Sequence, residues 1–293
     1  MEPIPNSKFR TPNSYVVCGP TASGKSELSD ILAEQLTERR GSRVPTVVVD
    51  SMQVYRELPI ITNQTRRRTA GLVGVVSVSE EWSVAAHRAC VGETVSSDDV
   101  FVLDAGTGMY LNAILLDFPL APKVPLELRR RAGELSANAP NPRRATRERE
   151  LQLAGADTRG SVWEGELRYE TSIIYLCPPR DVLDAAIAGR SRRIAQSGLG
   201  EAETLRAMLG RGEKINPSVM DSVGVRELLQ HLSGEITLDH AQDLIATRTR
   251  RLARRQIRWF DKLTRTLQGR ASITILEDPS QAELHSMHDI IGT

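Results

Sequence analysis

The sequence predicts an α/β protein with a mostly parallel sheet, a short helical insert and a helical C-terminal region. Three observations support this. Short apolar runs alternate with helical stretches in the first half of the chain, a polar, proline-containing segment interrupts the middle, and the last third is largely helical. Alternation of short apolar runs with helices is typical of parallel strands that are covered by helices.

Six short apolar runs have the length and composition of strands. In chain order they are Tyr15–Cys18, Val44–Val49, Leu72–Val78, Val100–Leu103, Thr171–Leu176 and Ser272–Glu277. Helical patterns are expected between and after these runs, at about 24–39, 82–96, 107–116, 180–197, 200–211, 224–232 and 238–267, with a terminal helix after the last strand.

The middle of the chain predicts a separate helical insert. Leu126–Leu135 has a helical pattern, the turn cluster 136–142 follows, and Arg143–Leu153 is a very polar helix that leads through a glycine-containing linker to Trp163. We therefore divide the chain into a first part of the core at 1–125, an insert at 126–164, and the completion of the core with the C-terminal helices at 165–293.

Composition excludes several classes of protein. The net charge of the 293 residues is only +1, so nucleic-acid binding has to be argued from local clusters of charge. The three cysteines are widely spaced, which argues against a disulfide framework or a cysteine zinc site. No apolar run approaches the roughly 18 residues of a membrane helix. We expect a cytoplasmic protein that does not contact a membrane, and no obligate protein partner is evident.

The most informative motif lies between the first predicted strand and the first helix. It runs Gly19-Pro20-Thr21-Ala22-Ser23-Gly24-Lys25-Ser26 and has the Walker A spacing. Backbone N–H groups of such a loop and the N-terminus of the following helix bind phosphate, Lys25 adds a cation, and the Ser26 hydroxyl can ligate Mg²⁺. The motif predicts a P-loop NTPase-like core and a diphosphate site, without showing that the diphosphate belongs to ATP.

Two aspartates follow predicted strands. Asp50 follows the run Val44–Val49, and Asp104 follows Val100–Leu103 and precedes Ala105-Gly106-Thr107-Gly108. Because ligands bind at the carboxyl ends of parallel strands, we expect Asp50 near Lys25. Asp50 could assist a magnesium ion, act as a general base, or cap a helix. Thr107 could donate to a phosphate oxygen or cap its own helix.

Arginines crowd one half of the predicted C-terminal helix. Six of them share that face without an acidic residue among them: Arg248, Arg250, Arg251, Arg254, Arg255 and Arg258. The opposite face is apolar. A charge run of one sign favours a phosphate-rich partner over a solvated face. The run Arg66-Arg67-Arg68 is left open between an RNA contact and a solvated loop.

Five blocks in order resemble one family. GPTASGKS, DSMQVYR, AGTGMYLNAILL, VGVRELLQHLSGEI and TRRLARRQIRWF run from residue 19 to residue 260. They are similar to the tRNA dimethylallyltransferases, also called tRNA isopentenyltransferases. The first block is shared with many kinases, whereas DSMQVY and ARRQIRWF are much more specific. The resemblance implies transfer of a dimethylallyl group from dimethylallyl diphosphate to N6 of the adenosine beside the anticodon.

The resemblance also implies roles for individual residues. Asp50 would accept the N6 proton, Thr21 and Thr107 would contact substrates near the diphosphate, and Lys25 with Arg226 would offset the charge of the leaving group. Asp50 and Ser51, Met52 and Gln53 would hold the adenosine. The residues expected to contact tRNA in the insert and in the C-terminal helix are Arg129, Arg144, Arg147, Arg250, Arg251, Arg254 and Arg255.

The chain departs from the family pattern at several positions. Gln64 stands where the family commonly has a lysine, Val225 replaces a tyrosine, Leu72–Ser79 replaces a His-His-Leu segment, and the helical insert is short. An adenylate isopentenyltransferase, a P-loop kinase and an RNA-binding paralogue with weak catalysis are therefore alternatives to a tRNA-modifying enzyme.

Overall fold

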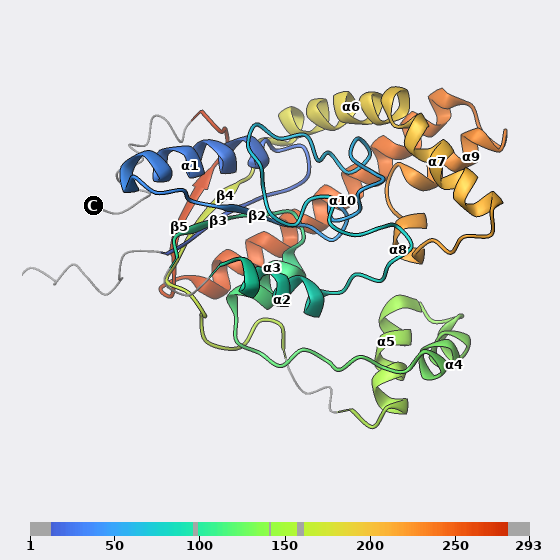
Figure 1. Ribbon diagram of the computed structural model, residues 1–293, viewed down its shortest axis with the longest axis horizontal. Coiled ribbons are helices and arrows are strands. Elements are labelled where there is room, and N and C mark those ends of the chain that lie inside the picture. Colours follow the sequence, from blue (N-terminus) through green and yellow to red (C-terminus); the bar gives the residue numbers. More distant parts are fainter. Residues whose placement is uncertain (1–12, 96–98, 141, 157–160, 281–293) are drawn as a thin grey trace, which may run out of the picture. The chain divides into compact units, whose positions relative to one another are not determined.

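The computed structural model describes residues 13–95, 99–140, 142–156 and 161–280; the side chains of residues 126 and 142–144 lie outside this description. The chain forms two compact units, one from residues 1–115 and 167–293 and one from residues 116–166 (Figure 1). The larger unit contains the sheet and the phosphate-binding loop, and the smaller one contains two helices.

The larger unit is built on a five-stranded parallel sheet. Its strands are β1 (Ser14–Cys18), β2 (Thr46–Val49), β3 (Phe101–Ala105), β4 (Thr171–Leu176) and β5 (Ser272–Leu276), in the order β2-β3-β1-β4-β5. The register pairs Cys18 with Ala105 and Ala105 with Val49, so β1, β3 and β2 end level with one another. The order reverses at β1, which is where ligands bind in such sheets. The predicted α/β class is confirmed.

The helices of the larger unit agree with the sequence patterns to within a few residues. They are α1 (Lys25–Arg40), α2 (Val84–Thr94), α3 (Gly108–Leu115), α6 (Arg180–Ser197), α7 (Leu199–Gly210), α9 (Val225–Leu232) and α10 (Leu238–Leu267). The short helix α8 (Pro217–Met220) was not predicted, because four residues are too few to show a periodic pattern. Its start is marked by Asn216, whose side chain accepts a hydrogen bond from the Ser218 N–H.

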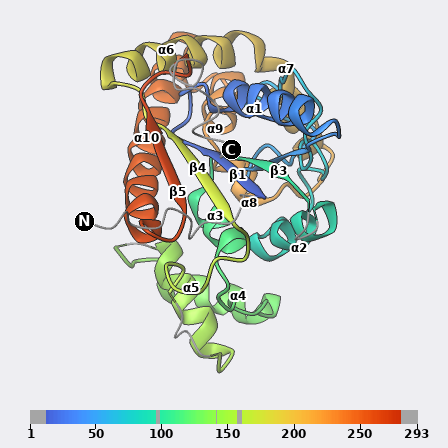
Figure 2. The ribbon, with the colours of Figure 1, turned by 90° about the vertical axis from the view of Figure 1, so that its left-hand side faces the viewer.

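Helices cover both faces of the sheet (Figures 1 and 2). On one face, Leu28, Leu32 and Leu36 of α1 pack against Val17 and Ile174. Each of these fully buried leucines contributes about 2 kcal/mol through removal of apolar surface from water. On the other face lie α3 and the C-terminal half of α10, whose Phe260 ring contacts the ring of Tyr175. Packing on both faces thus holds the strands in place and fixes the positions of the carboxyl ends of β1, β2 and β3.

A second apolar cluster joins the segment after β2 to the C-terminal helices. Leu58 and Ile61 pack with residues of α6, α9 and α10, among them Ile194, Leu228 and Ile245. This cluster lies beside the loop that follows Asp50, so the helical C-terminal region fixes that loop by packing.

The prediction of a strand at Leu72–Val78 was wrong. Leu72 and Gly74 have φ values of 63° and 60°, which are incompatible with an extended strand. Only two isolated bridges occur here, between Gly71 and Val47 and between Val76 and Tyr55. The apolar residues of this segment are explained by burial of Leu72 and Val78 in a loop that lies along β2.

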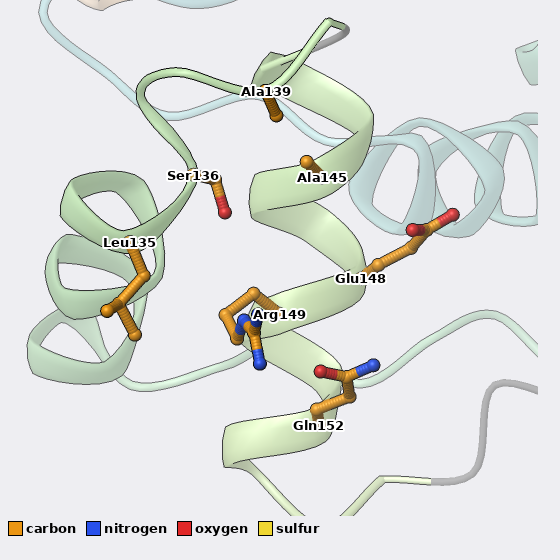
Figure 3. Close-up of a pocket in the computed structure, with 7 residues that line it drawn as sticks. All are labelled: Leu135, Ser136, Ala139, Ala145, Glu148, Arg149 and Gln152. Carbon is orange, nitrogen blue, oxygen red and sulfur yellow. The ribbon is translucent and has the colours of Figure 1, made fainter.

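The smaller unit contains α4 (Leu126–Ser136) and α5 (Pro142–Leu153), close to the two helices that the sequence predicted. The Asp117 N–H donates to the Glu166 carbonyl and joins the two ends of the unit. A hollow of about 180 Å³ lies between the helices (Figure 3). It is lined by Leu135, Ser136, Ala139, Ala145, Glu148, Arg149 and Gln152. The role of this unit as a tRNA-contacting insert with bounds 126–164 stays a prediction, and the expected terminal helix lies outside the described residues.

In the part of the chain that the structure describes, no helix combines the length and apolar character needed to cross a membrane.

His87 connects α2 to the sheet through a buried imidazole. Its Nε2 lies 3.0 Å from the Val48 carbonyl oxygen, and Trp82 Nε1 donates to Nδ1 at 3.1 Å. The two contacts require the neutral tautomer that carries its proton on Nε2. Burial lowers the pKa of His87 to about 4, against a smaller rise from the hydrogen bond to Val48.

The buried imidazole makes stability depend on pH. The pKa of His87 is lower in the folded chain than in the unfolded one, so its contribution is complete above about pH 6.5 and is lost as the pH falls toward 4. We expect the wild-type free energy of unfolding to fall by up to about 3 kcal/mol more than that of His87→Gln over this interval. Denaturant unfolding at several pH values measures the difference. His240→Gln, at an exposed position of α10, should keep the wild-type slope. Equal slopes for wild type and His87→Gln would contradict the expectation.

Candidate active site

The phosphate-binding loop lies between β1 and α1. Ala22 and Gly24 have φ values of 67° and 90°, and a Cβ at Gly19 would lie 2.3 Å from the carbonyl oxygen of Leu176. These positions explain why small residues are needed in the loop. The Ser23 hydroxyl is buried and has no hydrogen-bond partner among the described residues. A buried hydroxyl beside a helix N-terminus can donate to a phosphate oxygen. The predicted residues 19–26 therefore form one loop with the geometry of an anion site.

Lys25 lies at the start of α1 with a side chain that is almost inaccessible to water. Burial lowers the pKa of its ammonium group, and the carboxylates of Asp104 and Asp50 counter this effect. The cation that the motif predicted is thus placed near Asp50, which follows β2, and near Asp104, which lies within β3 and not after it.

Asp50 follows β2 and is oriented by the turn that it begins. Its Oδ1 accepts hydrogen bonds from the N–H groups of Met52 and Gln53, at 2.8 and 3.2 Å. Its Oδ2 faces Gly106: a Cβ added to that glycine would lie 2.6 Å from Oδ2 and 3.7 Å from Lys25 Nζ. The carboxylate and the ammonium group therefore lie against the same glycine, as expected from their positions at strand ends.

Thr107 precedes α3 and also contacts Ser51, in the turn after β2. Both the Gly106 and Thr107 N–H groups donate to the Val49 carbonyl at 3.1 Å. The Thr107 hydroxyl accepts from the Ser51 N–H at 3.1 Å, and lies 3.4 Å from the Ser51 hydroxyl. The turns after β2 and β3 are thus tied together, which brings Thr107 into the group that contains Asp50 and Lys25.

Gln53 is buried and its amide oxygen has no partner in the described part of the chain. Met52 packs at the edge of the second apolar cluster. The two side chains place an apolar surface and a hydrogen-bond acceptor on the segment that begins with Asp50. A purine base requires both kinds of contact.

Arg66 is neither an RNA contact nor part of a solvated loop. Its side chain is only 4% exposed and makes ion pairs with Asp104 at 2.5 Å and Asp30 at 2.8 Å. It also donates to the Ser26 carbonyl at 3.2 Å. Arg66 therefore ties the start of α1 to the end of β3, a role that a run of three arginines does not indicate.

Two further residues reach the site without having been singled out from the sequence. Gln256 of α10 accepts a hydrogen bond from the Thr21 N–H at 2.8 Å and donates to the Gly106 carbonyl at 2.7 Å. Its place inside the specific block ARRQIRWF was the available signal. Arg190 of α6 lies one turn after Ile187, which packs with Ala22 of the loop. Burial lowers the pKa of Arg190 to about 10, and the charge of Asp50 counters that effect.

The arginines of α10 fall into two groups. Arg248 pairs with Glu227 and lies near Asp221, and Arg250 pairs with Asp184 at 3.3 Å. The expected cationic face is therefore smaller than the sequence indicated, since these two guanidinium groups already have acidic partners. The exposed group comprises Arg251, Arg254, Arg255 and Arg258.

The helix α10 is held against the site by its aromatic residues as well. A Cβ at Gly108 would lie 2.2 Å from Cδ1 of Trp259, so the indole packs directly on the glycine at the start of α3. Trp259 Nε1 also donates to the Asn112 side chain at 3.1 Å. The exposed arginines are therefore carried by a helix that contacts the turn after β3.

The remaining predicted cations are not joined to this group by the described contacts. Arg226 is exposed on α9 and has no hydrogen bond or ion pair within the described residues. Arg147 pairs with Glu150 at 2.7 Å and donates to the Pro122 carbonyl inside the smaller unit. Arg129 is half-buried on α4, and the side chain of Arg144 lies outside the described residues.

The groups that could ligate a metal ion lie at the start of α1 and in β3. No group of three or more His, Cys, Asp or Glu residues that could hold a metal occurs in the described part of the chain. Asp104 Oδ1 is buried without a hydrogen-bond partner there, and Arg66 contacts both Asp104 and the Ser26 backbone. One serine hydroxyl and one free carboxylate oxygen suit Mg²⁺ that takes most of its ligands from phosphate and water.

The fold and the site together define a P-loop α/β protein with a carboxylate beside the loop that joins β1 to α1. Residues 53–152 and 134–263 match the family model described as IPP transferase. This chain belongs to the IPP transferase family. It is 59% identical to a tRNA dimethylallyltransferase of Rubrobacter xylanophilus, over 97% of this chain and 100% of the relative, and 33% identical to one of Thermobifida fusca, over 83% and 85%.

Two solved structures share the fold. The tRNA isopentenylpyrophosphate transferase of Bacillus halodurans matches with a TM-score of 0.68 at 24% identity, over 95% of each chain. A eukaryotic dimethylallyltransferase acting on tRNA matches with a TM-score of 0.68 at 21% identity, over 95% of this chain and 77% of the other. The predicted P-loop-like fold is confirmed by these matches.

The buried ammonium group should dominate binding of a diphosphate. We expect Lys25→Met to weaken binding of inorganic diphosphate about 10- to 100-fold, because a charge-assisted contact is lost. Isothermal titration calorimetry measures the dissociation constant. Lys214→Met, at an exposed position after α7, is the matched control and should bind as the wild type does. Unchanged binding by Lys25→Met would remove Lys25 from the site.

Proposed function

We propose that this chain transfers a dimethylallyl group from dimethylallyl diphosphate to N6 of the adenosine adjacent to the anticodon in tRNA. The observation that carries the proposal is the convergence of Lys25 and Asp50 on Gly106, between the phosphate-binding loop and a segment suited to a purine. The 59% identity to a tRNA dimethylallyltransferase over its entire length supports both the reaction and the acceptor.

The reaction separates into departure of diphosphate and attack by nitrogen. As the C1–O bond of the donor breaks, positive charge develops on the allyl group and negative charge on the diphosphate oxygens. The loop N–H groups, the Ser23 hydroxyl and Lys25 stabilise the diphosphate charge, with Arg190 as a further cation of the site.

Attack requires loss of a proton from N6. The exocyclic amine of adenosine is a weak nucleophile, so a carboxylate placed to accept its proton assists the new C–N bond. Asp50 Oδ1 is engaged by the backbone of its own turn, and Oδ2 is the oxygen directed to Gly106. We assign Oδ2 as the proton acceptor, with Thr107 and Gln53 as contacts to the substrates and Met52 as apolar surface beneath the base.

Magnesium fits the start of α1. Ser26 and the free oxygen of Asp104 would hold it together with oxygens of the diphosphate, and it would supply positive charge to the leaving group. Arg226 stays a proposed contact to the diphosphate, since it has no partner among the described residues.

The exposed arginines of α10 support tRNA as the acceptor. A mononucleotide cannot contact Arg251, Arg254, Arg255 and Arg258 together, because they extend along two turns of helix. A target base must leave its stack to enter the site, which costs a few kcal/mol that backbone contacts offset. Arg129, Arg144 and Arg147 of the smaller unit are proposed as further contacts. If tRNA is the acceptor, the protein is expected in the cytoplasm.

The second candidate function is prenylation of free adenylate. The specific observation in its favour is the small size of the unit at 116–166. Against it, the Rubrobacter relative that is matched along its whole length is a tRNA dimethylallyltransferase. Mass analysis of nucleosides in bulk tRNA from a deletion strain decides between them. Loss of the prenylated adenosine supports the proposal, and unchanged tRNA nucleosides contradict it. A requirement for ATP in the purified reaction would instead indicate a kinase.

The carboxylate of Asp50 should be required for the rate and not for RNA binding. We expect Asp50→Asn to lower the single-turnover rate of prenyl transfer by about 10²- to 10⁴-fold, because the amide keeps the acceptor for Met52 and Gln53 and loses the base. Gel-shift titration should give a tRNA affinity within twofold of the wild type. Asp50→Ala, which also loses the turn, should be at least as slow. A near-normal rate for Asp50→Asn would reduce Asp50 to a structural role.

Binding of tRNA should weaken steeply with salt. Each phosphate contact contributes about 0.7 to the slope of log K against log salt on single-stranded RNA. We expect the triple change of Arg251, Arg254 and Arg255 to alanine to flatten that slope by about 2. Prenylation of free AMP should be far slower than that of an anticodon stem-loop and should not respond to this change.

A charge-matched control separates position from net charge. The triple change of Arg39, Arg40 and Arg43, exposed at the end of α1 away from the loop, removes the same charge and should leave the slope unchanged. Intact binding by the α10 variant, or a better rate with AMP than with the stem-loop, would replace tRNA by a free nucleotide.

A further inference from the structure

Gln256 is the polar side chain of α10 that contacts both sides of the candidate site. Its amide oxygen accepts from the Thr21 N–H of the phosphate-binding loop at 2.8 Å, and its amide nitrogen donates to the Gly106 carbonyl at 2.7 Å. Thr21 and Gly106 belong to segments 85 residues apart in the chain, and Gln256 is a further 150 residues away. Both hydrogen bonds have favourable lengths and are partly buried.

The chemistry of an amide explains why glutamine occupies this position. One segment presents an N–H and the other a carbonyl, so the bridge needs an acceptor and a donor on the same rigid group, which an amide provides. A carboxylate lacks the donor, and an ammonium group lacks the acceptor. The flanking residues Ile257 and Ala253 pack with Ile187 and Ala22, which holds the backbone of α10 beside the loop.

The two contacted segments carry the reacting groups. Thr21 lies four residues before Lys25, in the same phosphate-binding loop. Gly106 is the glycine against which Asp50 Oδ2 and Lys25 Nζ both lie. A shift of the Gly106 turn relative to the phosphate-binding loop would therefore change the distance between the Asp50 carboxylate and the diphosphate. Misplacement of reacting groups by about 1 Å can cost a factor of about 10² in rate.

We propose that Gln256 is a positioning residue that sets the separation of the phosphate-binding loop and the Gly106 turn, so that the donor diphosphate and Asp50 are held in register. This inference rests on the proposed function for its kinetic consequences. Helix α10 also carries the exposed arginines. The helix that positions the donor side of the site is therefore the helix to which the acceptor is proposed to bind.

The test replaces the amide with an isosteric apolar side chain. We expect Gln256→Met to raise the KM for dimethylallyl diphosphate about 10-fold and to lower kcat, since both hydrogen bonds of the amide are lost. The dissociation constant for tRNA should stay within twofold of the wild type. Gln242→Met, near the start of the same helix and half-buried, is the matched control and should leave all three constants unchanged.

A purely structural role predicts a different pattern. If Gln256→Met only reduced the amount of folded protein, kcat per total enzyme would fall while the KM for dimethylallyl diphosphate stayed as in the wild type. This result overturns the proposal, as does a variant with wild-type kinetics. If the methionine variant does not fold, Gln256→Glu takes its place under the same criterion, because it keeps the acceptor for Thr21 and loses the donor to Gly106.

Calorimetry with inorganic diphosphate separates this inference from the proposed function. We expect Gln256→Met to bind diphosphate about 10-fold more weakly than Gln242→Met. Equal binding overturns the positioning role even if prenyl transfer is confirmed. Weaker binding supports it even if the wild-type protein transfers no prenyl group to tRNA, in which case the proposed function alone fails.

Discussion

Lys25 carries its positive charge at the point where β1 ends and α1 begins, on a side chain that water scarcely reaches. An isolated buried charge costs several kcal/mol, so the surrounding carboxylates are required for the fold as well as for the chemistry. Asp104 and Asp50 provide them, and Asp104 is in turn held by Arg66 together with Asp30. The parallel sheet places the ends of β2 and β3 beside the phosphate-binding loop, and these charge contacts stabilise that arrangement.

The balance of charge in this group bears on how a diphosphate enters. The cations Lys25, Arg66 and Arg190 face the carboxylates of Asp30, Asp50 and Asp104, so the protein groups have no net charge of their own. The proposed diphosphate would bring several negative charges into this neutral group. A magnesium ion that takes its ligands mainly from the diphosphate, as proposed above, would offset them.

Features set by local pattern were predictable from the sequence, and features set by long-range contacts were not. The Walker A spacing fixed the loop, and the position of Asp50 after a strand placed it beside Lys25, because level strand ends follow from a parallel sheet. Arg66 was unpredictable, since its two partners lie 36 and 38 residues away and its neighbours in sequence are also arginines. The apolar run 72–78 was misinterpreted because burial in a loop requires the same residue types as burial in a strand.

The contact between Trp259 and Gly108 leaves no space for even one methyl group. An indole against bare backbone is a stiff contact, unlike one between long side chains that can change rotamer. The backbone of α10, which carries the exposed arginines, is consequently held against the start of α3, two residues after the Gly106 that Asp50 Oδ2 faces. In the proposed reaction, an acceptor whose backbone charges and reactive base are spaced to match the distance from α10 to Asp50 would meet both at once, and a shorter one would have to forgo the arginines or the carboxylate. The packing at Gly108 would then make the length of the acceptor a criterion of selection, independent of the identity of its base.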